Sequence, residues 1–357
     1  MKCGASLAAR GFPDMQVAEL TGLRHFDIVD RPAPDPGPGE LQVKVAAIGI
    51  CGSDMHAYSE GAVGESPCHY PMVIGHEPSG VVVKTGAGVS GFSAGDRGAL
   101  EPALYCYHCE FCMRGQHNIC AHLRFMSSGR EPGYFRECVN IPVANFLPIP
   151  TDMSLEQAAL VEPIAIALHS MVFAQLKLGE TAVVFGAGPI GLLTIAVLKL
   201  SGAGRVWAVE PMAHRRELAK LMGADAVMDP NAVDPAVQVM NDTGKRGADL
   251  VIDCASKYDM INQCVRAVVH GGRVVLTGIP GETQIALNIH QFRNKEVAIF
   301  NVRRSNHESH LGVELLRDHP KLFAPLVTHS RPLDKINEAF ALNEKYEDGV
   351  GKLLLRP

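Results

Sequence analysis

Residues 181–200 read TAVVFGAGPIGLLTIAVLKL. A short β-branched run, a glycine-rich turn and an apolar segment of helical length follow one another in that order. This order is typical of a buried parallel strand that leads through a tight turn into a helix. Gly186 allows the tight turn, Gly188 lets the backbone approach a pyrophosphate, and Gly191 permits close packing of the helix on the strand.

The helix that starts at Pro189 and Ile190 then offers free N–H groups to a bound anion. Two other interpretations of this stretch exist. Residues 181–198 carry no charge and are long enough to cross a membrane, but the glycines and Pro189 divide the run into a strand and a helix, which argues against a span. The turn is also explicable as an ordinary glycine-rich loop, although its position between strand and helix favours dinucleotide binding.

The next strand-like run, RVWAVE at 205–210, ends in an acid. Glu210 lies 19 residues beyond Gly191, where a dinucleotide-binding fold places a carboxylate to hydrogen-bond the adenosine ribose. A carboxylate there favours NAD over NADP, because a 2′-phosphate would meet a like charge. Arg215 lies just downstream and is a candidate to pair with such a phosphate.

Helical and strand-like segments continue to alternate to about residue 302, which predicts a doubly wound parallel sheet. The first 160 residues are instead rich in Pro and Gly, with short β-branched runs at 41–48 and 81–84, and predict a β-rich domain. After residue 302 the alternation ends, and the chain closes with the apolar run at 353–355. The prediction is an α/β protein with a β-rich domain at 1–164, a nucleotide-binding domain at 165–302, and a return to the first domain at 303–357.

Composition sets limits on the function. A chain of 357 residues is long for one core, so two domains are expected. The formal net charge of −5 offers no basic field for nucleic acid. The segment 1–11 lacks the apolar stretch and cleavage site of a secretory signal, so a cytoplasmic location without a membrane partner is expected.

Four cysteines, Cys106, Cys109, Cys112 and Cys120, form the pattern C-x2-C-x2-C-x7-C. Four thiolates at such short separations can close a tetrahedron around one Zn²⁺ ion, which predicts a filled, structural metal site. A redox C-x-x-C pair is the alternative, but it needs two cysteines and not four. A zinc ribbon that binds DNA is a further alternative, but the net negative charge of the chain argues against it.

A second group of candidate metal ligands lies upstream. GICGSDMH at 49–56 and GHE at 75–77 supply thiol, hydroxyl, imidazole and carboxylate groups. A catalytic zinc needs about three protein ligands and an open position at which an alcohol oxygen can bind and lose its proton. Taken alone, Cys51 is equally explicable as a small buried residue and His76 as a core histidine.

With these motifs in place, the sequence resembles the medium-chain zinc-dependent alcohol dehydrogenase superfamily, and within it the sorbitol (polyol) dehydrogenase branch. The resemblance covers nearly the whole chain and rests on motifs in the family's order: GICGSDMH, PMVIGHEPSGVV at 71–82, GDR at 95–97, the four cysteines, LVEPIAIALHS at 160–170, GAGPIG, the acid at the end of RVWAVE, PLVTH at 325–329 and GKLLL at 351–355. It implies a GroES-like catalytic domain beside a Rossmann domain, a catalytic and a structural zinc, and NAD.

The resemblance also implies roles for single residues. Cys51 and His76 match the two constant ligands of the catalytic zinc. Glu162 stands where alcohol dehydrogenases have a third, cysteine ligand. In the polyol branch Glu77 is the direct ligand and Glu162 holds a zinc-bound water, and the sequence leaves the choice between the two glutamates open.

The proton path follows from the same likeness. Ser53 matches the hydroxyl that takes the substrate proton, and His56 matches the histidine that passes it to solvent. Asp54 is expected to stabilise the turn or to orient a metal ligand.

Two departures concern the substrate. Ala57 follows His56 where polyol dehydrogenases commonly have an aromatic residue, with Tyr58 one position later. The Arg-Tyr pair of the branch is here Arg303 and Arg304, which favours a more oxygen-rich or anionic substrate if the arginines do not simply lie on the surface.

The expected function is NAD-linked oxidation of a secondary alcohol of a polyol or sugar alcohol to a ketone, with butanediol, threonine or sugar substrates as alternatives. A non-catalytic NAD-binding redox sensor and a metal-free quinone reductase both predict missing ligands, and the ligands are present. The resemblance implies a homotetramer or homodimer.

Overall fold

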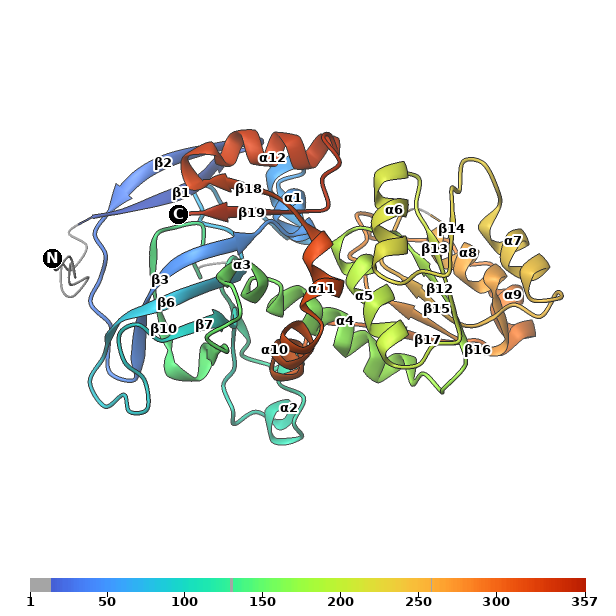
Figure 1. Ribbon diagram of the computed structural model, residues 1–357, viewed down its shortest axis with the longest axis horizontal. Coiled ribbons are helices and arrows are strands. Elements are labelled where there is room, and N and C mark those ends of the chain that lie inside the picture. Colours follow the sequence, from blue (N-terminus) through green and yellow to red (C-terminus); the bar gives the residue numbers. More distant parts are fainter. Residues whose placement is uncertain (1–13, 129–130, 258) are drawn as a thin grey trace, which may run out of the picture.

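Two sheets organise this computed structural model, which describes residues 14–128, 131–257 and 259–357 (Figure 1). The expectation about a signal at 1–11 lies outside the described residues. One sheet is mostly antiparallel and the other is parallel, and they lie in two bodies joined by helices in the middle of the molecule. The fold class predicted from the strand rhythm, a β-rich part beside a doubly wound parallel sheet, is confirmed.

The first sheet has the order β11-β7-β6-β3-β19-β18, and β10 also pairs with β3. Its strands are β3 (Glu40–Gly49), β6 (Glu77–Thr85), β7 (Arg97–Leu100), β10 (Cys138–Pro142), β11 (Phe146–Pro148), β18 (Val327–Pro332) and β19 (Lys352–Arg356). Strand β19 pairs antiparallel with the end of β3, with Leu354 opposite Gly49. The last residues of the chain therefore lie beside the first long strand.

Smaller elements surround this sheet. They are the pairs β1 (Met15–Gly22) with β2 (His25–Arg31), β4 (Ala62–Val63) with β5 (Ser66–Pro67) and β8 (Ala103–Leu104) with β9 (Arg124–Phe125), and the helices α1 (Gly52–Ser59), α2 (Glu110–Met113), α3 (Leu155–Ala158) and α12 (Ile336–Lys345). An apolar core of aromatic and aliphatic side chains, including Phe26, Tyr58, Phe135 and Phe340, fills the interior.

The second sheet is parallel, with the order β14-β13-β12-β15-β16-β17. Its strands are β12 (Thr181–Phe185), β13 (Arg205–Val209), β14 (Ala226–Met228), β15 (Ala248–Asp253), β16 (Val268–Leu276) and β17 (Ala298–Asn301). Its helices are α5 (Pro189–Leu200), α6 (Ala213–Leu221), α7 (Pro235–Asp242), α8 (Met260–Ala267) and α9 (Ile289–Lys295).

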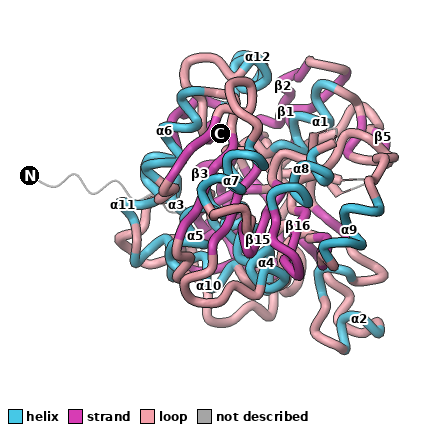
Figure 2. The backbone as a smooth tube through the Cα atoms, turned by 90° about the vertical axis from the view of Figure 1, so that its right-hand side faces the viewer, coloured by secondary structure: helices cyan, strands magenta, loops and turns pink. Residues whose placement is uncertain are grey.

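Alternate residues of these strands enter two different cores. Along β12, Ala182 and Val184 pack toward α5, whereas Val183 and Phe185 pack with residues of α7 and α8. Because side chains alternate along a strand, helices cover both faces of the sheet, as Figure 2 shows. The stretch at 181–198 is thus a buried strand and a helix, as its glycines predicted.

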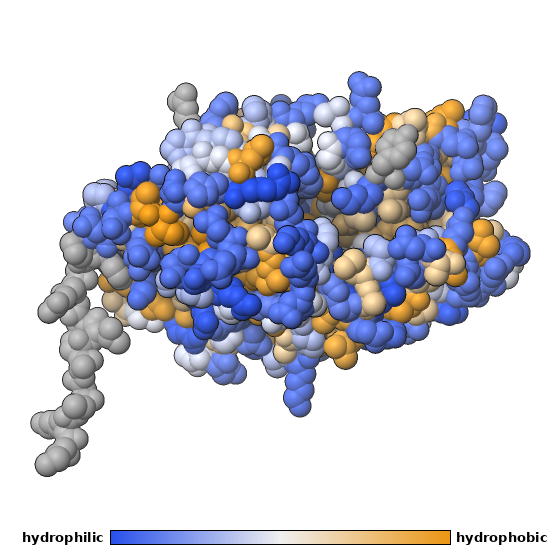
Figure 3. Space-filling view, turned by 90° about the horizontal axis from the view of Figure 1, so that it is seen from above, coloured by the Kyte–Doolittle hydropathy of each residue, from blue (hydrophilic) through white to orange (hydrophobic). Residues whose placement is uncertain are grey.

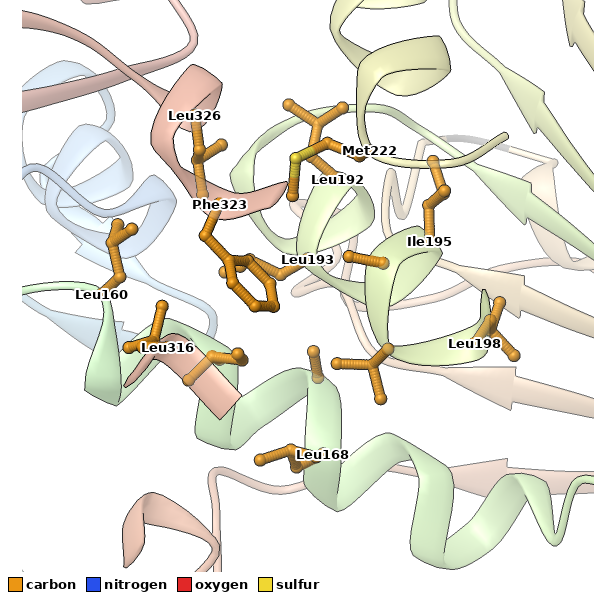
Figure 4. Packing of buried hydrophobic residues seen from close by; sticks show 14 of the residues in the cluster. Leu160, Leu168, Leu192, Leu193, Ile195, Leu198, Met222, Leu316, Phe323 and Leu326 are labelled. Atoms are coloured by element: carbon orange, nitrogen blue, oxygen red, sulfur yellow. The ribbon is translucent and has the colours of Figure 1, made fainter. Parts of the chain in front are cut away.

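Helix α4 (Val161–Ala174) leads from the first body to the second and packs against α5 and α10 (Ser309–Asp318). Helix α11 (Pro320–Phe323) lies beside them. Figure 4 shows Leu160, Leu168, Leu316 and Phe323 meeting the leucines of α5 in one apolar cluster. The two bodies therefore share a continuous core.

The stretch Leu155–Ala174, formed by α3 and α4, is long and apolar enough to cross a membrane by length and composition, but 67% of its apolar 18-residue window is buried inside the structure. A membrane span would leave its sides exposed to lipid, so this burial identifies a core helix. In the view of Figure 3, hydrophilic residues cover most of the surface, and apolar residues occur in small separate groups.

Candidate metal and dinucleotide site

The end of β3 and the start of β6 bring the first three candidate ligands together. In the strand register Gly49 lies opposite Glu77, so Cys51, two residues later, reaches the same place as His76 and Glu77. Their ligand atoms all lie within 4.8 Å of one another. Residues separated by 25 positions in the sequence thus form one cluster at a strand end.

Asp54 orients this cluster from the first turn of α1. Its carboxylate is buried and accepts hydrogen bonds from the backbone N–H groups of Cys51 (3.0 Å) and Gly75 (3.2 Å). Its Oδ1 also faces His76 Nδ1 at 3.3 Å. Burial acts to lower the pKa of His76, but the charges of Asp54 and Cys51 outweigh it and hold that pKa well above its usual range.

Lys352, on β19, is the residue of this cluster that the sequence analysis missed. Its side chain is only 1% exposed, and its ammonium contacts Glu77 Oε2 and donates to the carbonyl of Ile50 (3.0 Å). Burial acts to lower the pKa of Lys352, and the charges of Glu77 and Cys51 raise it above its usual range. The only feature of the sequence that could have pointed to Lys352 is its position directly before the apolar run LLL.

The donors of Cys51, His76 and Glu77 fit a Zn²⁺ ion. Thiolate, imidazole and carboxylate are the ligand types that zinc takes in catalytic sites, and three of them leave an open position. Glu77 Oε1 is buried and has no hydrogen-bond partner among the described residues, as expected of an atom arranged for a cation. Cys51 also stands at the N-cap of α1.

Glu162 lies near this cluster without belonging to it. It is in the first turn of α4, and its carboxylate is not among the atoms that meet within 4.8 Å. Burial raises its pKa to about 7, with Glu77 and Glu101 adding to the increase and His76 and Lys352 opposing it. Among the described residues, Glu77 therefore belongs to the close cluster of donor atoms and Glu162 does not.

The two candidate proton carriers lie at different depths. Ser53 Oγ is 3.4 Å from His76 Nε2, beside the cluster. His56 Nδ1 is 2.9 Å from Glu60 Oε1, and the His56 side chain is 26% exposed, so it reaches solvent. Ala57 and Tyr58, in contrast, point into the core, where Tyr58 stacks near Phe26 with ring centroids 5.9 Å apart.

The four cysteines lie together in a loop around α2 that projects from the body in Figure 2. Their sulfur atoms are 3.5 to 3.9 Å apart in the pairs Cys106–Cys120, Cys106–Cys112 and Cys109–Cys120. Zn–S bonds of about 2.3 Å in a tetrahedron separate the sulfurs by about 3.8 Å. The loop therefore fits a second, fully coordinated zinc, and none of its cysteines forms a disulfide.

The glycine-rich turn has the geometry that dinucleotide binding needs. Gly186 has φ of +87°, and a side chain there would also press on Ala255. A Cβ on Gly191 would overlap the carbonyl oxygen of Gly186, so only glycine allows α5 to pack this close. At Gly188, the N-cap of α5, a Cβ would meet only Arg215 Nη1 at 3.9 Å, which leaves this face open to a pyrophosphate.

Glu210 and Arg215 both face this turn. Glu210 is 4% exposed and accepts hydrogen bonds from the N–H groups of Ala187 (2.8 Å) and Met212 (3.0 Å). Each carboxylate oxygen keeps a lone pair for a ribose hydroxyl. The Arg215 guanidinium stacks on the ring of Tyr346, a residue of the other body, with 4.2 Å between Arg215 Cζ and the ring centroid.

Comparison with known proteins agrees with this geometry. Residues 37–151 match the model of the alcohol dehydrogenase GroES-like domain, and residues 189–317 match that of the zinc-binding dehydrogenases. A sorbitol dehydrogenase of Bacillus subtilis is 30% identical over 96% of this chain and 98% of its own length. An L-threonine 3-dehydrogenase of Pyrococcus horikoshii is 35% identical over 92% of this chain and 95% of its own.

A solved structure described as a short chain alcohol dehydrogenase from Escherichia coli CFT073, in complex with NADH, superposes with a TM-score of 0.87 at 30% identity. It covers 97% of this chain and 100% of the other. The metal donors, the dinucleotide turn and these likenesses lead to one conclusion. The chain belongs to the zinc-binding alcohol dehydrogenase family, near its polyol branch, whose members are oxidoreductases that act on CH–OH groups with zinc and a nicotinamide dinucleotide.

Proposed function

We propose that the protein oxidises a secondary alcohol of a polyol or sugar alcohol to a ketone, reversibly, with NAD as the hydride acceptor. The observation that supports this most directly is the meeting of Cys51, His76 and Glu77 within 4.8 Å. Relatives named for sorbitol and for threonine share the same architecture, so a secondary alcohol is the common substrate feature.

In the proposed site, Cys51, His76 and Glu77 would hold the catalytic zinc, and Glu162 would hold a water on its outer side. Bound zinc supplies a Lewis acid that lowers the pKa of the substrate alcohol. Ser53 accepts the alcohol proton, and His56 passes it to solvent. Asp54 keeps His76 in place, and Lys352 balances the charge of Glu77.

The turn at Gly186, Gly188 and Gly191, with Pro189 and Ile190 at the helix start, holds the pyrophosphate and so positions the nicotinamide. Cys106, Cys109, Cys112 and Cys120 hold a structural zinc. We further propose domain boundaries at 164/165 and 302/303, a homotetramer or homodimer, and a cytoplasmic location.

The direct test incubates the zinc-loaded protein with NAD and a panel of alditols, diols and threonine, and follows the absorbance of the reduced nicotinamide. Formation of NADH with alditols is expected. Absence of NADH with every alcohol, at full zinc content, would refute the proposal.

The NAD preference rests on Glu210. Replacing Glu210 with Ala removes the hydrogen-bond acceptor for the ribose. Because a hydrogen bond to a charged group is worth roughly 1.5–3 kcal/mol, we expect the affinity for NAD to fall about 10-fold or more, and the affinity for NADP to fall less. Dissociation constants from calorimetry measure both. Glu217→Ala, on the exposed side of α6, is the matched control, and an unchanged NAD-to-NADP ratio in the Glu210 variant would contradict the role.

A further inference from the structure

Arg215 is a buried side chain whose charge has no close partner in the part of the chain that the structure describes. It lies on α6 and is only 9% exposed, and its Nε atom is buried without a hydrogen-bond partner. Among the described residues its guanidinium takes part in no ion pair and no hydrogen bond. The neighbouring Arg216, in contrast, pairs with Asp229 (3.2 Å) and donates to the carbonyl of Glu210 (2.8 Å). Burying an unpaired charge is costly, so the arrangement of Arg215 points to a bound anion.

The guanidinium of Arg215 faces the start of α5. A Cβ added to Gly188 would meet Arg215 Nη1, at 3.9 Å, as its nearest contact from elsewhere in the chain. Gly188 is the N-cap of α5, and the first N–H groups of a helix have no partner within it, so they bind anions. The helix start and the guanidinium therefore adjoin the same anion-binding position.

The position of Glu210 indicates which phosphate fits there. Its carboxylate accepts hydrogen bonds from the N–H groups of Ala187, in the turn (2.8 Å), and of Met212 (3.0 Å). A dinucleotide fold places the adenosine ribose at this acid, so a 2′-phosphate would meet a like charge. The pyrophosphate, which such a fold places at the glycine-rich turn, is the anion that suits both Gly188 and Arg215.

Tyr346 contacts the guanidinium from the other body. It is the C-cap of α12, with φ of +54°, and its ring centroid lies 4.2 Å from Arg215 Cζ. His214, the residue before Arg215, has its Nε2 atom 3.2 Å from the carbonyl oxygen of Val350. Two consecutive residues of α6 therefore touch the end of α12 and the segment after it, on the side of the first body that faces the second in Figure 1.

Stacking on an aromatic ring leaves the donors of a guanidinium available. The cation lies over the π face of the ring, and its N–H groups, which lie in its own plane, still form hydrogen bonds. A stacked arginine is also ordered before the ligand arrives, so it loses less conformational entropy on binding. An aromatic residue at position 346 therefore strengthens phosphate binding by Arg215 without contacting the phosphate.

We propose that Tyr346 is a positioning residue for the cofactor: its ring holds the Arg215 guanidinium beside the glycine-rich turn, where the guanidinium binds the pyrophosphate. The β-rich body thereby contributes to dinucleotide affinity through one aromatic side chain. This inference rests on the proposed function, because it needs the dinucleotide to bind at Gly186, Gly188 and Gly191.

The test titrates the zinc-loaded protein calorimetrically with NADH, with ADP-ribose, which keeps the pyrophosphate, and with adenosine, which lacks it and is measured by displacement of NADH. Arg215→Met should weaken the binding of NADH and ADP-ribose about 10-fold, because it removes a charge-assisted hydrogen bond. Tyr346→Leu and Tyr346→Gln should each weaken both about 4-fold, and Tyr346→Phe, which keeps the ring, should change them by less than about 2-fold. The affinity for adenosine should change by less than about 2-fold in every variant, since adenosine carries no phosphate.

A double-mutant cycle separates positioning from a direct contact of Tyr346 with the cofactor. In the Arg215→Met background, Tyr346→Leu should change the affinity for NADH by less than about 2-fold, because the side chain that the ring positions is already absent. Tyr107→Leu, the same substitution at an exposed tyrosine of the four-cysteine loop, is the matched control and should bind all three ligands like the wild-type protein.

Three results overturn the inference while leaving the proposed function intact: equal NADH affinity in Tyr346→Leu and the wild-type protein, an equal loss of affinity for adenosine and ADP-ribose, or an undiminished effect of Tyr346→Leu in the Arg215→Met background. A larger loss for NADPH than for NADH in Arg215→Met would assign Arg215 to a 2′-phosphate and would also contradict the inference. A wild-type protein that binds no NADH would refute the proposed function instead.

Discussion

Cys51 shows how the catalytic site can be tested one side chain at a time. Replacing Cys51 with Ala removes the thiolate from the three-ligand cluster, and a catalytic zinc is not held by two ligands. We expect the zinc content to fall from about two ions per chain to about one, with loss of turnover and an intact fold. Elemental analysis and circular dichroism measure these outcomes.

Cys68→Ala is the control for that substitution. Cys68 is also a free, half-buried thiol, but it belongs to neither metal cluster. Its variant should keep both ions. If Cys51→Ala also kept both, the ligand assignment would be wrong.

Glu162 makes the stability of the zinc-free protein depend on pH. Burial raises the pKa of this carboxyl from 4.5 to about 7 in the folded chain, so folding favours its protonated form. The stability that this group contributes is present below its ordinary pKa and is lost as the pH rises through about 7. Between pH 5 and pH 8, we expect the melting temperature of the zinc-free Glu162→Gln variant to decrease less than that of the zinc-free wild-type protein.

Glu156→Gln serves as the comparison, because Glu156 is exposed on α3. It should show the full wild-type decrease. Equal slopes for the Glu162 and Glu156 variants would show that Glu162 does not titrate in this range.

Candidate ligands are easier to propose from the sequence than the groups that surround them. Cys51, His76 and Glu77 stand in short motifs whose residue types are those of a zinc site, and the β3–β6 register brings them together. Lys352 lies 275 positions from Glu77, on a strand whose pairing with β3 no local pattern encodes. Its role depends on tertiary contacts, and these are invisible to periodicity and spacing.

Among the elements, the four-cysteine loop is the most independent. Its ligands lie within 15 positions and meet without long-range pairing. Cys112→Ala should remove one zinc ion, leave the catalytic ion bound and lower the melting temperature by about 5 °C or more, because metal binding contributes directly to folding. Calorimetry and elemental analysis check both effects.

Met113→Ala is the neighbouring control, since Met113 lies in the same loop next to Cys112 but is 74% exposed and is not a metal donor. It should melt like the wild-type protein. A wild-type melting temperature for Cys112→Ala would contradict the structural assignment of this zinc.

The glycine-rich turn was the element most fully predictable from the sequence. Gly186 has the positive φ and Gly191 the close backbone contact that their positions in the motif demand. The strand β13, however, ends at Val209, one residue before the expected Glu210, although the Glu210 N–H still donates to the carbonyl of Met228 on β14 (3.0 Å).

At the scale of the whole molecule, the shared core predicts cooperative unfolding. Phe323, Leu168 and Leu193 come from both bodies and pack in one cluster (Figure 4). We expect a single calorimetric transition for the holoenzyme. Phe323→Ala should leave a cavity that costs about 3–5 kcal/mol, which corresponds to a decrease of roughly 5 °C in a chain of this size.

Lys321→Ala, an exposed change on the same short helix, should have no such effect. Two separate transitions in the wild-type protein would show that the bodies unfold independently. The same melting temperature for Phe323→Ala and Lys321→Ala would show that the cluster does not join them.

The pairing of β19 with β3 also dictates an order of assembly during synthesis. The four cysteines are complete once residue 120 has left the ribosome, so their ion can load on the nascent chain. Glu77, in contrast, lacks its charge partner until Lys352, six positions from the C-terminus counting itself, has emerged. A chain that loses its final strand is therefore expected to lack the charge partner of Glu77 while it keeps all four cysteines.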